Sequence, residues 1–258
     1  MELLQISHNI PPDKWEGVYK MWLRKSKTRT EVSLYHFINA RADKGYRAKF
    51  LGTDNYFNIQ AWSNSGLGAL KDKLQNKISV GPQRAFTFGT CIHELLLEPE
   101  KINLLDDYCL RPSEIKAVEG MFQEARKHKL LMRVISNGQC EKEIRWTDTV
   151  TGFQCKAKVD ILEKQGFDLK TSAAKNIDDF KDSVKRYEYD RQAAWYMDGI
   201  TQNGFQCDKF TFIVIQKVAP FKIFCYTIQK GSDEYLRGVK KYKFLLNKAQ
   251  LLDIEPII

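Results

Sequence analysis

The stretch Lys156–Lys170, which reads KAKVDILEKQGFDLK, predicts the centre of the fold. An apolar, alternating run ends on Asp160, and a second short run carries Asp168 and Lys170 two residues apart. Side chains at positions i and i+2 of a β-strand project from one face, so this carboxylate and this ammonium should point the same way. If the two runs pair through the turn at 163–166, Asp160 can lie opposite Asp168.

Two facing carboxylates indicate a metal site. They repel each other, and a divalent cation that prefers oxygen ligands relieves the repulsion. A lysine beside such a cation can orient or polarise a water molecule that attacks a phosphodiester. Carboxylates and lysines also gather in solvated hairpin turns, so the spacing of Asp160, Asp168 and Lys170 alone leaves a purely structural hairpin open.

The composition favours a soluble protein that binds polyanions. The chain has 258 residues, 43% of them hydrophobic, and can bury a core of its own. It has no run of about 18 apolar residues and no basic and apolar leader, so we expect a cytoplasmic protein without a membrane span. A net charge of +9 favours nucleic acid as the partner, because bound phosphates release counterions. A basic surface without such a partner is the alternative.

The cysteines are scattered and show no C-x-x-C spacing. Together with the missing leader, this favours reduced thiols over disulfides, zinc or an iron–sulfur cluster. The six positions are Cys91, Cys109, Cys140, Cys155, Cys207 and Cys225.

The chain divides into a basic helical arm or extension at residues 1–55 and a main domain at 56–258. The first part holds ten Lys and Arg against six Asp and Glu. Trp15, Tyr19 and Trp22 follow the spacing of one helix face, which predicts packing on the main domain. The same segment could contact nucleic acid or be a solvated charged face, and both interpretations stay open.

The main domain is expected to have an α/β fold with a mixed central β-sheet flanked by helices. Ser63 or Ser65 should cap the first helix, and a second helix should stop near Pro99. The other expected elements are a helix at 113–133, strands at 139–147, 153–162 and 166–170, a helix at 178–200, strands at 209–216 and 221–229, and a helix at 232–252.

Several polar side chains are expected on shared faces of these elements. Gly89 and His93 are one helical turn apart, and the histidine is either a ligand or a hydrogen-bonded core residue. Gln192 and Tyr196 also project together, as functional residues or as rim residues. On the first strand of the hairpin, Glu141 and Glu143 should share a face. On the second strand, one face should carry Lys156, Lys158 and Asp160, and the opposite face should carry Cys155, Ala157, Val159 and Ile161.

Five segments between residues 60 and 230 together resemble a known family. The chain is similar to the PD-(D/E)xK nuclease superfamily and, within it, to the RecE or exonuclease VIII type of phage and prophage recombination exonucleases. The segments, in order, are WSNSGLGALK, FTFGTCIHELLLEPE, KAKVDIL, GFDLKTS and RQAAWY. Val159 departs from the family, in which proline or glycine often precedes the aspartate.

The resemblance implies a role for individual residues. It implies metal ligation by His93, Asp160, Asp168 and the carbonyl of Leu169, with Glu141, or else Glu143, as a further acidic ligand. Lys170 is the implied catalytic lysine, and Gln192 and Tyr196 match the element that borders the site. The expected DNA contacts are Ser63, Ser65, Arg84, Lys156, Lys158, Lys175 and Arg191.

The resemblance also implies an activity and partners. It implies a Mg²⁺-dependent exonuclease, with Mn²⁺ as a substitute, that degrades double-stranded DNA 5′ to 3′ from an end and leaves a 3′ overhang. A ring-shaped trimer or tetramer, a single-strand annealing protein and a bacterial host cytoplasm are the implied setting. A structure- or site-specific endonuclease and a catalytically silent DNA-binding module are the alternatives, and the complete set of Asp160, Asp168 and Lys170 argues against the silent one.

Overall fold

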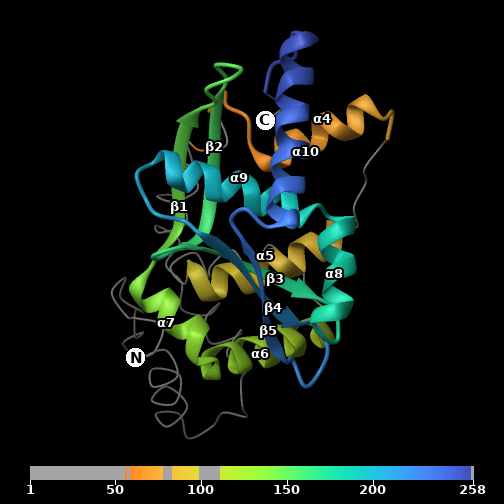
Figure 1. The fold of residues 1–258 in the computed structure, drawn as a ribbon. Coiled ribbons are helices and arrows are strands. Elements are labelled where there is room, and N and C mark those ends of the chain that lie inside the picture. The colour runs from red at the N-terminus through yellow and green to blue at the C-terminus, as the bar shows by residue number, and fades with distance from the viewer. Residues whose placement is uncertain (1–55, 57–58, 78–82, 99–110, 257–258) are drawn as a thin grey trace, which may run out of the picture.

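The computed structural model describes residues 56, 59–77, 83–98 and 111–256, so the predicted arm at 1–55 lies outside the described residues. Within them the chain forms seven helices and five strands (Figure 1). The helices are α4 (Asn64–Leu74), α5 (Gln83–Leu97), α6 (Pro112–Lys127), α7 (Lys129–Asn137), α8 (Ile177–Arg186), α9 (Tyr189–Gln202) and α10 (Asp233–Leu251). The strands are β1 (Gln139–Thr147), β2 (Gln154–Leu162), β3 (Gly166–Ser172), β4 (Lys209–Gln216) and β5 (Ile223–Gln229).

The strands form one mixed sheet in the order β1-β2-β3-β4-β5. Hairpin connections make β1–β2, β2–β3 and β4–β5 antiparallel, whereas β3 and β4 are parallel. The parallel pair follows from the connection, because α8 and α9 carry the chain from the end of β3 back to the start of β4. The predicted α/β fold with a mixed, helix-flanked sheet is confirmed.

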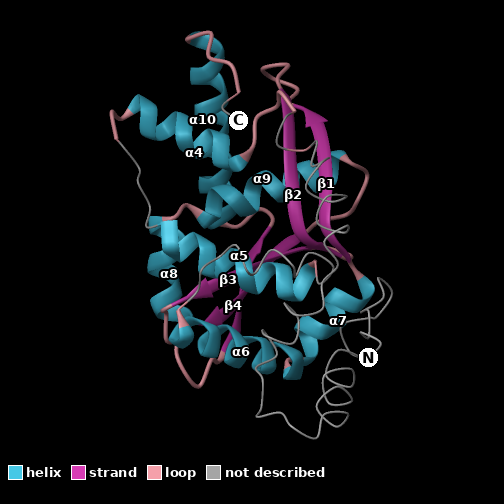
Figure 2. Cartoon of the chain, turned by 180° about the vertical axis from the view of Figure 1, so that it is seen from behind, coloured by secondary structure: helices cyan, strands magenta, loops and turns pink. Residues whose placement is uncertain are grey.

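Helices cover both faces of the sheet and bury two apolar clusters (Figures 1 and 2). Alternation along β4 sends Phe210, Phe212 and Val214 into the cluster with α4, α8, α9 and α10. Ile213 and Ile215 point into the other cluster, with α5, α6 and α7. The helices expected to carry site residues therefore pack on opposite faces of the sheet, α9 on one face and α5 on the other.

Two of the expected helices are each split in two. The helix expected at 113–133 breaks at His128, which is extended and whose ring Nδ1 accepts a hydrogen bond from the Leu131 amide at 3.3 Å as a new helix cap. The helix expected at 178–200 breaks at Tyr187 and Glu188, and Glu188 adopts a left-handed φ of 53°. Neither break contains proline or glycine, so the sequence carries no strong signal for it.

Other local expectations can be compared directly. Ser63, rather than Ser65, caps α4, and its hydroxyl accepts a hydrogen bond from the Gly66 amide at 3.0 Å. The cysteines at 91, 140, 155, 207 and 225 form no disulfide with one another, and Cys109 lies outside the described residues. None of the described helices has the length and apolar character needed to cross a lipid bilayer.

Candidate active site

The strands β2 and β3 separate at the two aspartates. They pair only through Ile161 with Phe167 and Leu162 with Gly166, and the same register continued by one step would set Asp160 opposite Asp168. The two carboxylates therefore stand at the fork between the strands. The sequence predicted that Val159 and Ile161 share one face of β2. This was wrong, because the alternation of side chains breaks at Asp160 and the two residues pack into apolar clusters on opposite faces of the sheet.

Backbone and histidine contacts hold Asp160 at the fork. Its Oδ2 accepts a hydrogen bond from the Leu169 amide at 2.7 Å and lies 3.4 Å from His93 Nδ1. The other ring nitrogen of His93, Nε2, lies 2.7 Å from the Leu169 carbonyl oxygen. Helix α5 thus brings His93 to the Leu169 carbonyl of β3, which the resemblance implies as a ligand.

Glu141 completes a group of three possible ligands. The pairs on either side in the β1–β2 register set Glu141 opposite Asp160. Glu141 itself is not paired with β2, and its backbone has a left-handed φ of 51°. Such a φ costs energy in a residue other than glycine, and residues of this kind concentrate at functional sites. One ligand atom each from His93, Glu141 and Asp160 lie within 4.8 Å of one another. Glu143, the other candidate, contacts Arg145 at 3.5 Å instead.

The second carboxylate lies deeper and is paired with the lysine. Asp168 Oδ2 is 2.6 Å from Lys170 Nζ, which bears out the shared face of the two side chains, and Gln192 donates to Asp168 Oδ1 at 2.6 Å. Burial alone would lower the pKa of Lys170, but the carboxylates of Asp168 and Asp160 and the Tyr189 hydroxyl raise it above its usual value. Lys170 is therefore an ammonium at neutral pH.

The electrostatics of the fork suit a divalent cation. Burial, followed by the charges of Asp168 and Glu141, raises the pKa of Asp160 well above its usual value. Burial also lowers the pKa of His93, which favours the neutral imidazole that ligates metals. A cation would offset the repulsion between the carboxylates, and their hard oxygens accept both Mg²⁺ and Mn²⁺. His93, Asp160, Glu141 and the Leu169 carbonyl are the groups that would hold it, with Asp168 beside them.

A stripe on α9 borders the site. Burial and the carboxylates of Asp168 and Asp160 raise the pKa of Tyr196, which keeps its hydroxyl protonated. Tyr189, which was not among the predicted site residues, lies on the same stripe, and Lys170 Nζ is 4.9 Å from the centroid of its ring. The spacing of Tyr189, Gln192 and Tyr196 at i, i+3 and i+7 is the signal that could have revealed it.

Two predicted DNA contacts are buried by contacts within the protein. Lys156 is only 4% exposed, and its ammonium donates to the carbonyls of Tyr56 at 2.8 Å and Ile59 at 3.0 Å. Arg191 is 5% exposed and donates through Nε to Asn64 Oδ1 at 3.0 Å. Lys156 holds the segment before α4, and Arg191 holds the start of α4 itself. Neither cation is available to a phosphate.

The other predicted contacts lie in different surroundings. Ser63 is committed to its helix cap, whereas Ser65 and Lys175 are exposed. Lys158 lies close to the site, with Nζ 2.9 Å from Glu141 Oε2 and 4.0 Å from Glu98 Oε1. Arg84 belongs to α5, and its side chain lies outside the described residues.

The comparison with protein families agrees with this geometry. Residues 64–252 match the model of a family described as a PDDEXK-like domain of unknown function (DUF3799). The chain belongs to this PDDEXK-like family. No curated protein matches the chain. The resemblance drawn from the five sequence segments is confirmed at the level of the nuclease superfamily.

Solved structures support the PDDEXK-like fold. A proposed exonuclease from Eubacterium rectale superposes with a TM-score of 0.58 at 18% identity, over 78% of this chain and 83% of the other. A phage-related exonuclease from Haemophilus somnus 129PT covers 91% of this chain and 96% of its own, at 13% identity and a TM-score of 0.40. At these identities the first comparison supports the fold alone, and the second is too distant to add to it.

Binding of Mg²⁺ or Mn²⁺ at the fork should stabilise the PDDEXK-like domain. A ligand that binds only the folded state adds about 2.7 kcal/mol at a hundredfold excess over its Kd, which raises the melting temperature by several degrees. Asp160→Asn should abolish the rise, because it removes a ligand charge. The control is Asp178→Asn, at a carboxylate that is 85% exposed on α8 and pairs with Lys181. Equal shifts in both variants, measured by thermal denaturation with EDTA as reference, would place the metal elsewhere.

Proposed function

We propose that this chain is a metal-dependent deoxyribonuclease that degrades double-stranded DNA from an end in the 5′ to 3′ direction and leaves a 3′ single strand. The observation that carries the proposal is the fork at which Asp160, Asp168, Lys170 and His93 converge. The family supports phosphodiester hydrolysis. Attack from an end is proposed from the sequence resemblance, and so is its direction.

The residues of the fork have distinct proposed roles. When bound, Mg²⁺ would lower the pKa of a water molecule and stabilise negative charge on the scissile phosphate. Lys170 is oriented by Asp168 at 2.6 Å and would hold the attacking water and the developing charge. Gln192 fixes the other oxygen of Asp168. Tyr196, which stays protonated, would donate a hydrogen bond to the DNA strand at the rim.

The wider setting is proposed from the same resemblance. Residues 56–258 would be the nuclease domain and residues 1–55 a basic extension. A homo-oligomeric ring, a trimer or a tetramer, would keep the enzyme on its DNA. A single-strand annealing protein would take up the 3′ overhang in recombination, in the cytoplasm of a bacterial host that carries phage or prophage genes. The remaining proposed phosphate contacts are Ser65, Arg84, Lys158 and Lys175.

Digestion of end-labelled DNA tests the activity. Linear duplex carrying a label at either the 5′ or the 3′ end is incubated with Mg²⁺ or EDTA, beside covalently closed circular DNA. We expect Mg²⁺-dependent release of the 5′ label as mononucleotide, with the circle intact. Cutting of the circle would replace the exonuclease by an endonuclease of the same fold. DNA binding without hydrolysis of any substrate would replace it by a silent binding module.

A further inference from the structure

An exposed tyrosine stands at the junction of α8 and α9, one ring away from the aromatic side chain that contacts Lys170. Tyr187 is 58% exposed, and its ring centroid is 5.7 Å from that of Tyr189. The Tyr189 ring in turn lies 4.9 Å from Lys170 Nζ. One ring–ring contact and one cation–ring contact therefore connect the solvent to the centre of the site, a span of at most about three stacked nucleotides at the 3.4 Å rise of a DNA strand.

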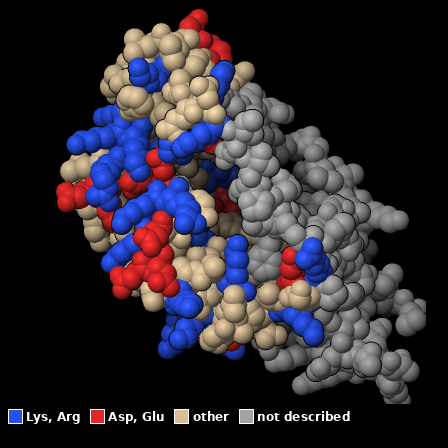
Figure 3. Space-filling model, turned by 90° about the vertical axis from the view of Figure 1, so that its right-hand side faces the viewer, with Lys and Arg blue, Asp and Glu red and all other residues tan. Residues whose placement is uncertain are grey.

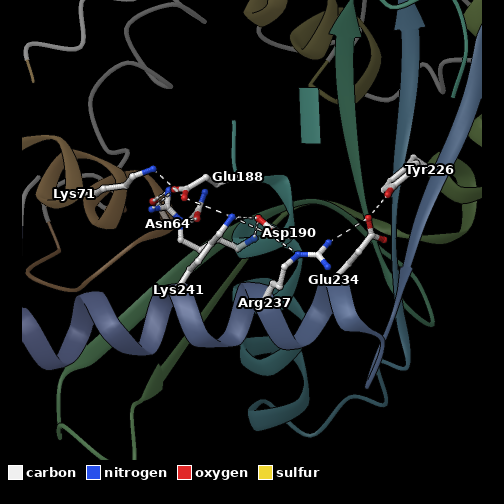
Figure 4. A network of polar contacts seen from close by, with 9 residues as sticks. Asn64, Lys71, Glu188, Asp190, Tyr226, Glu234, Arg237 and Lys241 are labelled. Atoms are coloured by element: carbon white, nitrogen blue, oxygen red, sulfur yellow. Dashed lines mark hydrogen bonds and ion pairs between the residues drawn. The ribbon is translucent and has the colours of Figure 1, made fainter. Parts of the chain in front are cut away.

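The turn that carries Tyr187 is held in place by ion pairs from two other helices. Glu188, with its left-handed φ of 53°, receives Lys71 of α4 at 2.9 Å and Arg191 of α9 at 3.2 Å. Lys241 of α10 lies 3.6 Å from Glu188 and donates to both oxygens of Asp190 at 2.9 Å (Figure 4). Burial alone would raise the pKa of Glu188, but these cations lower it, so the anchoring charge persists at neutral pH.

The surroundings of Tyr187 are basic. Lys185 and Arg186 form the last turn of α8 immediately before it, and both are exposed. Figure 3 views the side of the molecule on which α8 lies and shows lysine and arginine side chains interspersed with acidic ones over that face, so the excess of cations is local to the end of α8. An exposed aromatic ring next to cations is the arrangement by which proteins hold single-stranded nucleic acid, with bases stacked on rings and phosphates on the cations.

We propose that Tyr187 stacks on an unpaired base of the DNA strand that enters the active site, with Lys185 and Arg186 on the adjacent phosphates. The role rests on the proposed nuclease function and deepens it, because it specifies the form of the substrate. The enzyme would hold a frayed end, within about three nucleotides of the scissile phosphate, rather than a fully paired one. Tyr187 would thus determine specificity without touching the reacting atoms.

Fluorescence of 2-aminopurine tests the stacking. Duplexes with a short unpaired 5′ end carry the probe base at the first, second or third nucleotide, and Ca²⁺ replaces Mg²⁺ while a gel confirms that the probe stays intact. The wild type should quench one of these positions. Tyr187→Ala should lose the quenching and bind the frayed duplex about tenfold more weakly. Tyr187→Phe, which keeps the ring, should retain both properties, and affinity for a blunt duplex should not change.

A matched substitution separates stacking from a general surface effect. Phe244 on α10 is 57% exposed, close to the 58% of Tyr187, and packs beside Lys248 rather than beside the site. Phe244→Ala should therefore bind and quench like the wild type. Digestion of linear DNA by the wild type is assayed in parallel and reports on the nuclease function by itself. If the wild type digests DNA while Tyr187→Ala quenches and binds like it, the stacking role is overturned and the nuclease function stands.

Discussion

Asp168→Asn and Lys170→Met are each expected to reduce DNA hydrolysis by about a thousandfold or more. Groups that stabilise charge in a buried site contribute about 10² to 10³ in rate each, and these two are joined in one ion pair at 2.6 Å. Hydrolysis of linear duplex under single-turnover conditions measures the effect. A rate near that of the wild type in either variant would contradict the assignment of the fork as the catalytic centre.

The double variant separates catalysis from stability. Removing one partner of a buried ion pair leaves an uncompensated charge, which costs about 3–5 kcal/mol. Asp168→Asn/Lys170→Met removes both charges, so it should regain much of the stability that the single variants lose. It should regain none of the activity. Recovery of both would mean that the single variants had failed only because they were poorly folded.

Gly238→Ala is expected to lower the free energy of unfolding by about 2–3 kcal/mol, the upper range for overpacking. A Cβ at Gly238 would stand 2.1 Å from the backbone oxygen of Asp190, which cannot turn aside as a side chain would. Helix α10 would have to move away from α9. Because α9 carries Gln192 and Tyr196, hydrolysis should fall as well. Unfolding in urea and the digestion assay measure the two effects.

The matched control is the same substitution at a site with room. A Cβ at Gly89 on α5 would meet only Thr171 Oγ1, at an ordinary 3.5 Å. Gly89→Ala should therefore gain about 0.5–1 kcal/mol from helix propensity. Equal urea midpoints for the two variants would refute the close packing of α9 on α10.

The parts of the site that follow from local periodicity could be predicted from the sequence. Asp168 and Lys170 share a face because they are two residues apart on a strand that is regular over this stretch. The helix spacing of Gln192 and Tyr196 is similarly local. His93 required the family resemblance, because nothing in α5 itself shows which group of the sheet its ring will meet.

The predictions failed where contacts with segments distant in the sequence determine whether a side chain is buried or where a helix ends. Lys156 looked like a surface cation on an alternating strand, but its ammonium meets carbonyls at Tyr56 and Ile59, about a hundred positions earlier in the chain. Arg191 is buried for the same reason, against Asn64. At the break before α9, Glu188 is held by Lys71 and Lys241. Both lysines lie far from the break in the sequence, so the local sequence does not reveal these contacts.

The fork between β2 and β3 has a consequence for how such a centre can change over time. Asp160, Asp168 and Lys170 all belong to one short hairpin, so the turn between the strands sets their separation. His93 and Gln192 reach them from helices on opposite layers. Under the proposed function, mutations that shift those helices would alter metal affinity or the path of the DNA while the spacing of the hairpin residues persists. The groups proposed for the chemistry therefore form one local unit, and substrate choice could change around it without disturbing that unit.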